Sequence, residues 1–272
     1  MGRRFALGIA AAAATLACSP TPVRSPALDL ARVDLIDLTH TLGPKTLFWP
    51  TSPSGFALKQ LAYGPTPGGF FYSAYEFSAP EHGGTHIDAP IHFAEGALTT
   101  DRIPLAALVA PGVVIDVSTQ AAADADYRLT PQDIATFESA SGRIAAGAVV
   151  LLRTGWDARW GNRLAYFGDS TPGRASNLHF PGYGVEAARI LVDERQVAAL
   201  GIDSPSVDYG PSTDFQVHRI GAAKNVYNLE NLTGLDKVPA TGAYIFALPM
   251  KIEGGSGGPV RAVAVVPKPT AP

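Results

Sequence analysis

The chain has 272 residues, of which 46% are hydrophobic and 17% are charged, and its formal net charge is −3. This composition is typical of a soluble globular protein that is long enough to bury a full core. Because basic runs are absent, nothing in the sequence predicts a nucleic-acid partner. The 28 glycines and 23 prolines exceed ordinary usage and predict many turns and short strands.

The N-terminal residues 1–17 are typical of an export signal. Arg3 and Arg4 precede an apolar, alanine-rich segment that ends at Ala17 and is too short to span a bilayer. The only cysteine, Cys18, follows directly, and Leu16-Ala17-Cys18-Ser19 resembles a lipobox, in which the cysteine is lipidated after cleavage. We therefore expect an exported, periplasmic protein anchored to the membrane through Cys18, with residues 18–32 as a tether. Cleavage without lipidation is the alternative.

The first predicted strand covers residues 33–42, where apolar and polar residues alternate. It contains His40, which we interpret as a buried, hydrogen-bonded histidine rather than a metal ligand. Residues 43–70 hold five prolines and are predicted to form a loop. The loop carries Phe48 and Trp49, which either pack in the core or line a substrate pocket. A second alternating segment, residues 72–78, predicts another strand.

The rest of the chain predicts alternating strands and helices. A helix should begin after Thr130, because this N-cap residue is followed by a proline and, three positions later, by an acid. A second helix is predicted at 184–200, and 156–183 should be irregular. Predicted apolar strands are 113–117, 148–154, 199–203, 243–248 and 260–266, the last two antiparallel. This pattern indicates a mixed α/β fold with one domain over residues 33–267 and a short tail, 268–272.

The most informative segment runs from His82 to Phe93. Three of the six histidines fall within eleven residues, together with Asp88. His86 and Asp88 are two residues apart, so on a strand their side chains leave the same face. Gly83 and Gly84 allow the tight turn that brings His82 toward the same point. Imidazole and carboxylate groups bind zinc, manganese and iron, and the segment therefore predicts a metal site.

Further metal ligands must come from elsewhere in the chain, since one strand leaves a metal ion open on its other side. The remaining histidines are His40, His179 and His218. His218 precedes Glu230 by twelve residues, but this spacing alone does not show that the two side chains meet.

Four segments together resemble the cyclase family of metal-dependent hydrolases, which includes bacterial kynurenine formamidases (arylformamidases) and isatin hydrolases. These segments are Asp37-Leu38-Thr39-His40, the motif from His82 to Phe93, Gly201-Ile202-Asp203-Ser204-Pro205-Ser206, and His218 with Glu230. The similarity extends over residues 33–267. It implies a swivelling β/β/α fold and assembly into dimers or tetramers.

The resemblance also implies roles for individual residues. Formamidases of this family hold two metal ions through positions that match His82, His86, Asp88, His218 and Glu230, with the aspartate as a bridge. The position of His92 is that of the catalytic histidine. Isatin hydrolases hold one manganese ion, so one or two ions, manganese or zinc, are expected. The Gly83-Gly84-Thr85 sequence and the long aromatic loop favour the isatin hydrolase-like members.

We therefore predict a metal-dependent amidohydrolase that cleaves a C–N bond of a small aromatic or cyclic amide such as isatin. A bound metal ion lowers the pKa of water, and His92 would transfer the proton to the leaving nitrogen. Phe48, Trp49 and the glycine-rich segment 253–258 would border the substrate pocket. The alternatives are an arylformamidase acting on N-formylkynurenine, a lactonase or dehydrating cyclase, and a non-catalytic, exported metal- or ligand-binding protein.

Overall fold

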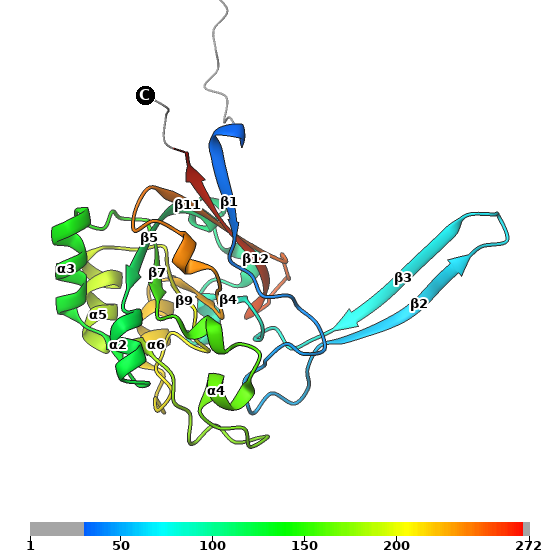
Figure 1. The fold of residues 1–272 in the computed structure, drawn as a ribbon, viewed down its shortest axis with the longest axis horizontal. Helices are drawn as coiled ribbons and strands as arrows, with labels where there is room; N and C mark the ends of the chain where they lie inside the picture. The colour runs from blue at the N-terminus through cyan, green and yellow to red at the C-terminus, as the bar shows by residue number, and fades with distance from the viewer. Residues whose placement is uncertain (1–29, 269–272) are drawn as a thin grey trace, which may run out of the picture.

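A mixed β-sheet that closes on itself forms the centre of the protein (Figure 1). The computed structural model describes residues 30–268. Eight strands follow the order β1-β12-β11-β5-β7-β9-β10-β4, and a further pairing of β12 with β4 closes seven of them into a barrel-like ring. Their bounds are β1 Val33–Asp37, β4 His86–Asp88, β5 Val109–Asp116, β7 Val149–Arg153, β9 Ala199–Ile202, β10 Tyr227–Glu230, β11 Ala243–Pro249 and β12 Gly257–Pro267.

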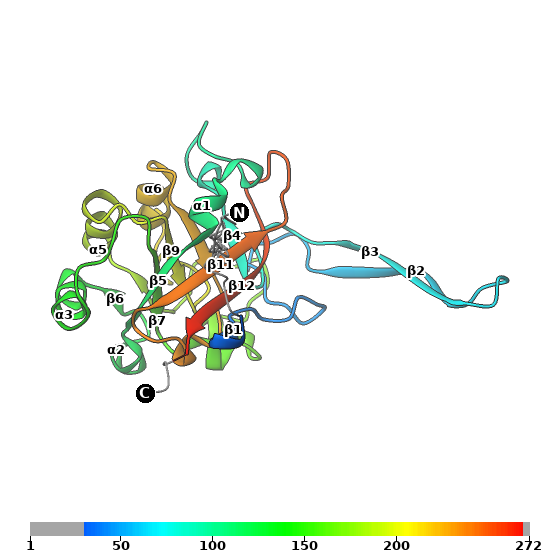
Figure 2. The ribbon, with the colours of Figure 1, turned by 90° about the horizontal axis from the view of Figure 1, so that it is seen from above.

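One half of the ring is parallel and the other half is antiparallel. Strands β5, β7, β9 and β10 run parallel to one another, whereas the pairings that involve β1, β4, β11 and β12 are antiparallel. The parallel strand β7 is a continuous apolar run buried on both faces, as expected for a strand with packed layers on either side. The helices gather on the outside of this parallel half (Figure 2). They are α2 Ser118–Ala123, α3 Pro131–Ser141, α5 Val185–Arg189 and α6 Gln216–Ala222.

Of the three hydrophobic clusters among the described residues, two follow from this arrangement. Leu151, Leu229 and Ile245 belong to a cluster that fills the inside of the ring. Val150, Leu152 and Leu200 belong to a second cluster, which includes residues of the covering helices. Consecutive side chains of β7 therefore pack in opposite layers, because side chains alternate between the two faces of a strand.

A two-stranded hairpin projects from this body (Figures 1 and 2). Its strands are β2 Ala57–Pro65 and β3 Phe71–Ser78, which pair with each other in a sheet of their own. We call residues 57–78 the arm. Smaller elements are α1 Leu105–Leu108, α4 Arg163–Phe167 and the paired strands β6 Arg128–Leu129 and β8 Gly182–Tyr183.

Several sequence-based predictions are confirmed. The fold is mixed α/β, with a mixed sheet and flanking helices. Helix α3 begins after Thr130, whose hydroxyl accepts a hydrogen bond from the amide of Asp133 in a full capping box. Strands β11 and β12 pair antiparallel as expected. The swivelling β/β/α description stays a prediction.

Three local predictions are wrong. The loop predicted over 43–70 from its five prolines contains β2, whose alternation is interrupted by a bulge between Gln60 and Ala62. The first strand ends at Asp37 rather than at 42. The helix predicted over 184–200 ends in a π-helical turn, Ile190–Glu194, and Gln196 follows with a φ of 53°, a left-handed conformation that does not continue a helix.

The predicted export signal, the anchor at Cys18, residues 18–29 of the tether and residues 269–272 of the tail lie outside the described residues. Between residues 30 and 268, no helix is both long enough and apolar enough to cross a membrane.

Candidate metal centre and its cavity

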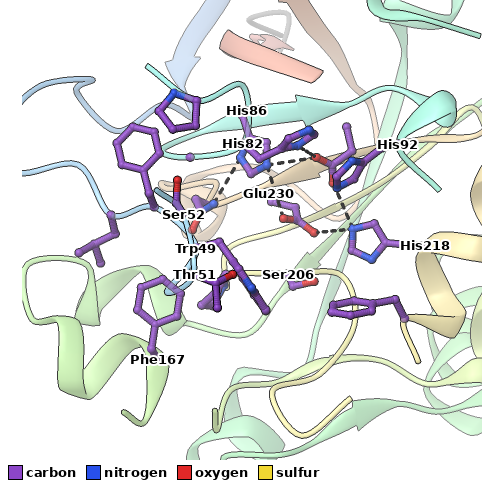
Figure 3. A pocket seen from close by; sticks show the side chains of 18 of the residues that line it. Trp49, Thr51, Ser52, His82, His86, His92, Phe167, Ser206, His218 and Glu230 are labelled. Atoms are coloured by element: carbon purple, nitrogen blue, oxygen red, sulfur yellow. Dashed lines mark hydrogen bonds and ion pairs between the residues drawn. The ribbon is translucent and has the colours of Figure 1, made fainter. Parts of the chain in front are cut away.

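The predicted ligands meet on the outer face of the ring, where β4 lies between β10 and β12. Ile87 and Leu229 point into the core of the ring. Because side chains alternate along a strand, their neighbours His86, Asp88 and Glu230 point outward. The antiparallel register places Glu230 directly opposite His86. These side chains line a cavity of about 440 Å³ (Figure 3).

The glycine pair ahead of β4 explains how His82 joins this group. Gly84 has a φ of +62°, and a Cβ at Gly83 would overlap the ring of Phe48. The turn therefore depends on residues without side chains. It places His82 Nδ1 2.6 Å from Asp88 Oδ1, and His86 Nε2 lies 3.1 Å from the same oxygen.

The two predicted ligands from the C-terminal half complete the set. His218 lies on α6 and Glu230 ends β10. His218 Nε2 is 3.2 Å from Asp88 Oδ2 and 3.2 Å from Glu230 Oε1, and Glu230 Oε2 is 3.6 Å from His86 Nε2. Two potential metal-binding groups result, and they share Asp88. One is His82, His86 and Asp88, and the other is Asp88, His218 and Glu230.

Hydrogen bonds on the outer side of each imidazole show which nitrogen faces inward and carries the lone pair when the ring is neutral. His86 Nδ1 donates to the carbonyl oxygen of Gly84 at 2.9 Å, and His218 Nδ1 donates to Asp208 Oδ2 at 2.7 Å. His82 Nε2 lies 2.9 Å from the hydroxyl of Ser256, which itself donates to Glu81. In each neutral ring the other nitrogen therefore presents a lone pair.

These three lone pairs face the carboxylates of Asp88 and Glu230. Lone pairs and carboxylate oxygens repel one another unless a cation or protons lie between them. Outer-side hydrogen bonds of this kind fix the tautomer of metal-binding histidines, and nitrogen and oxygen donors suit a divalent ion such as zinc or manganese. The residues therefore fit a metal ion.

The pKa values of His86, Asp88 and His218 also show that the site favours positive charge between its carboxylates. Burial disfavours the charged form of His86, but the negative charges of Asp88 and Glu230 outweigh this effect and raise the pKa of His86 to about 9. The pKa of His218 is also raised, because hydrogen bonds to Asp208 and Asp88 outweigh the effect of burial. Burial favours the neutral form of Asp88, but the surrounding imidazoles hold its pKa well below the usual range.

His92 lines the cavity but belongs to neither potential metal-binding group. It ends a short 3₁₀ turn, Pro90–His92, and its ring stacks on that of His82 with centroids 3.8 Å apart. Desolvation by the surrounding protein lowers the pKa of His92 to about 4, although the negative charge of Asp88 acts to raise it. The imidazole is therefore neutral at pH 7 and can accept a proton.

The wall of the cavity is aromatic, and it includes both predicted loop residues. Phe48 and Trp49 line it, as do Phe93, Phe167 and Phe215. The Trp49 ring meets those of Phe167 and Phe215 edge-on, at 6.5 and 6.2 Å between centroids. The glycine-rich segment contributes through Ser256, behind His82, rather than through the cavity wall.

The other two histidines lie apart from the potential metal-binding groups. His40 is half-buried and stacks on Trp160 at 4.2 Å, and its Nε2 atom has no hydrogen-bond partner, contrary to the predicted hydrogen bond. His179 forms an exposed pair with Asp126.

Asp208 is the polar residue that the sequence did not reveal. Its side chain accepts hydrogen bonds from the backbone amides of Val217 and His218 as well as from the His218 ring. It lies ten residues before His218 and shortly after the segment that ends at Ser206. Only the folded chain brings this carboxylate against the ring of His218.

Comparison with known proteins agrees with this site. A family described as "Putative cyclase" matches residues 36–209. The chain is 35% identical to an isatin hydrolase of Roseibium aggregatum, over 87% of this chain and 93% of the relative. It is 29% identical to a kynurenine formamidase of Salinibacter ruber, over 84% of this chain and 96% of that relative.

Among solved structures, isatin hydrolase A from Ralstonia solanacearum superimposes with a TM-score of 0.82 and 37% identity, covering 92% of this chain and 100% of that one. The resemblance inferred from the motifs is thus confirmed, and this chain belongs to the cyclase family.

Proposed function

We propose that this protein is a metal-dependent hydrolase that opens the C–N bond of a small cyclic aromatic amide of the isatin type. The observation that carries the proposal is the set of three inward imidazole lone pairs facing two carboxylates beside an aromatic cavity. The similarity to isatin hydrolases over most of the chain supports the substrate class.

In this proposal His82, His86, Asp88, His218 and Glu230 hold one or two divalent ions, manganese or zinc. If two ions bind, Asp88 would be shared between them, because it belongs to both potential metal-binding groups. When bound, such an ion polarises a carbonyl group and lowers the pKa of water. The hydrogen bonds from the outer imidazole nitrogens keep the ligands in position.

His92 acts as the acid and base. Its neutral ring at the cavity surface accepts a proton from water and donates it to the nitrogen that leaves the carbonyl carbon. The stacking contact with His82 holds the His92 ring beside the metal-binding groups. Trp49, Phe93 and Phe215 enclose a planar ring, and their apolar surfaces exclude bulk water from the cavity.

The second candidate reaction is the hydrolysis of N-formylkynurenine, which the similarity to kynurenine formamidases supports. A lactone is a third substrate class, because the same attack on a carbonyl carbon opens an ester. We further propose, from the sequence alone, that the protein is exported to the periplasm, that it is anchored through Cys18, that it forms homo-oligomers and that it adopts the family's swivelling β/β/α arrangement.

One experiment distinguishes these functions. Purified protein loaded with manganese or zinc is assayed with isatin, N-formylkynurenine and a panel of lactones. We expect isatin to be the best substrate. His86→Ala should lose metal binding, whereas His92→Ala should retain the metal and lose most turnover. His179→Ala is the matched control, because this histidine pairs with Asp126 away from the cavity. Full activity of His92→Ala would refute its assigned role.

A further inference from the structure

Ser206 lies on the wall of the cavity with Trp49, Glu230 and His218 (Figure 3). Only 2% of its surface is exposed. Its hydroxyl oxygen accepts a hydrogen bond from the backbone amide of Asp208 at 3.2 Å, and no group between residues 30 and 268 accepts the proton of this hydroxyl. A buried donor without an acceptor is unfavourable. The site therefore gains free energy when a ligand in the cavity supplies an acceptor.

The position of this hydroxyl is fixed by its neighbours in the chain. Ser204 Oγ lies 2.8 Å from the carbonyl oxygen of Pro181 and 3.1 Å from that of Ser206. On the other side, the backbone amide of Val207 donates to Glu230 Oε1 at 2.9 Å. A donor that is held in this way loses little freedom when a ligand binds, so its hydrogen bond favours ligands with an acceptor in the matching place.

The contact with Glu230 places the segment of Ser206 beside the candidate metal centre. Glu230 Oε1, which accepts the Val207 amide, is 3.2 Å from His218 Nε2. Both of these ligand residues belong to one potential metal-binding group. In the proposed function the carbonyl group that is hydrolysed is polarised by the metal ion. The hydroxyl of Ser206 therefore meets a different part of the same ligand.

The other hydroxyl groups of the cavity wall differ from that of Ser206. Ser52 Oγ donates to the backbone carbonyl of Ser54 at 3.1 Å, and Thr51 is exposed. Among the described residues, no lysine or arginine lines the cavity, so positive charge there is confined to the candidate metal centre. A carboxylate elsewhere on the ligand would be desolvated without a partner. The acceptor that suits Ser206 is therefore a neutral carbonyl oxygen.

We propose that the Ser206 hydroxyl donates a hydrogen bond to a second carbonyl oxygen of the substrate, next to the carbonyl group that is hydrolysed. Ser206 then selects cyclic amides with two adjacent carbonyl groups, such as isatin, over lactams with one, such as oxindole. A site that hydrogen-bonds a polar group rejects analogues without that group, because its own polar atom is left unpaired. This inference rests on the proposed function, since it takes the scissile carbonyl group to lie at the metal ion.

The test compares isatin with oxindole, which shares the lactam ring but lacks the second carbonyl oxygen. Their dissociation constants are measured by isothermal titration calorimetry with the manganese-loaded full chain, in the His92→Ala background that should lose most turnover. Ser206→Ala should weaken isatin binding about 2- to 10-fold, the effect of one neutral hydrogen bond, and oxindole binding by less than about twofold. Ser206→Cys should give an intermediate loss for isatin, because a thiol is a weak donor.

Ser52→Ala is the matched control, because this serine also lines the cavity but its proton is already donated to Ser54. It should change the two dissociation constants by the same factor. The manganese content of each variant is measured in parallel, so that a loss of metal is not mistaken for a lost contact with the ligand. If turnover persists in the His92→Ala background, kcat/KM for isatin and the inhibition constant of oxindole replace the dissociation constants.

The ratio of the two dissociation constants separates this contact from a structural role of Ser206. Equal weakening of isatin and oxindole by Ser206→Ala, or no weakening of either, would overturn the contact with the second carbonyl oxygen. A selective loss of isatin binding, with no isatin hydrolysis by the unsubstituted chain, would support the contact and refute the proposed reaction. Isatin hydrolysis together with equal weakening would refute the contact and leave the reaction standing. A parent protein that binds neither ligand overturns both.

Discussion

The carboxylate of Asp208 accepts the Nδ1 proton of His218, a histidine that we propose as a metal ligand, and Asp208→Asn tests whether this contact supports metal binding. Val217 N–H donates to Asp208 Oδ1, whereas the backbone amide and the ring Nδ1 of His218 both donate to Oδ2. An asparagine whose oxygen takes the Oδ1 position still accepts the amide of Val217, but its amide nitrogen faces His218 Nδ1. Two donors cannot share this position, so the imidazole shifts its proton to Nε2, where the metal ion would bind. An asparagine whose oxygen takes the Oδ2 position accepts the Nδ1 proton more weakly than the carboxylate does, because the amide is neutral.

The expected loss can be estimated in two ways. The substitution removes one hydrogen bond between a ring N–H and a charged acceptor, which contributes about 1.5–3 kcal/mol. Removing the carboxylate partner of a metal-binding histidine typically lowers metal affinity about 10- to 100-fold, which corresponds to about 1.4–2.8 kcal/mol. The two estimates agree, so we expect zinc affinity to fall by about this factor while the far-ultraviolet circular dichroism spectrum stays unchanged.

The assay is a competition between the protein and a chromophoric zinc chelator, followed by titration. Asp126→Asn is the matched control, because Asp126 forms the same kind of pair with His179, at 2.8 Å, outside the cavity. The control should bind zinc as the wild type does. An Asp208→Asn protein whose zinc affinity stays within twofold of the wild type would show that the carboxylate does not determine the tautomer of His218.

Three further substitutions test other contacts. Gly257→Ala should lower the metal affinity and reduce the free energy of unfolding by about 1–3 kcal/mol, because a Cβ there would overlap the His82 ring and a carbonyl oxygen of β4. Zinc titration would measure the affinity, and urea unfolding would measure the stability. Gly43→Ala is the control, because a Cβ at Gly43 would contact nothing. Thr130→Ala removes the side-chain cap of α3 and should reduce the free energy of unfolding by about 1 kcal/mol, whereas an unchanged urea midpoint would argue against the capping box. His40→Phe should reduce the pH dependence of stability. Burial lowers the pKa of His40 to about 4, so between pH 6.5 and 4 the unfolded chain binds more protons than the folded chain, and stability falls as the pH falls. The difference in unfolding free energy between pH 7 and pH 4.5 should therefore be smaller in the variant, and an equal difference would contradict the assignment.

Local sequence determined the N-terminal part of the candidate metal centre. The two-residue spacing of His86 and Asp88 sets their common face wherever the strand lies, and the glycines before them are required by the turn itself. The same holds for α3, whose start depends on a capping box between residues only three positions apart, Thr130 and Asp133. Such features could be read from the sequence because the interacting groups are neighbours along the chain.

Tertiary structure decided the rest of the centre. Glu230 reaches His86 because β10 pairs with β4 across more than a hundred residues. Helix α6 brings His218 to Asp88, and no local pattern encodes either contact. Asp208 acquires its role only when α6 places His218 against it. The alternation of residues 72–78 predicts β3, but the prolines of residues 43–70 and the bulge between Gln60 and Ala62 conceal β2 in the sequence, and only the folded chain shows that the two strands pair. Residues close in sequence determined which groups could bind a metal ion, and contacts between distant strands decided which of them meet.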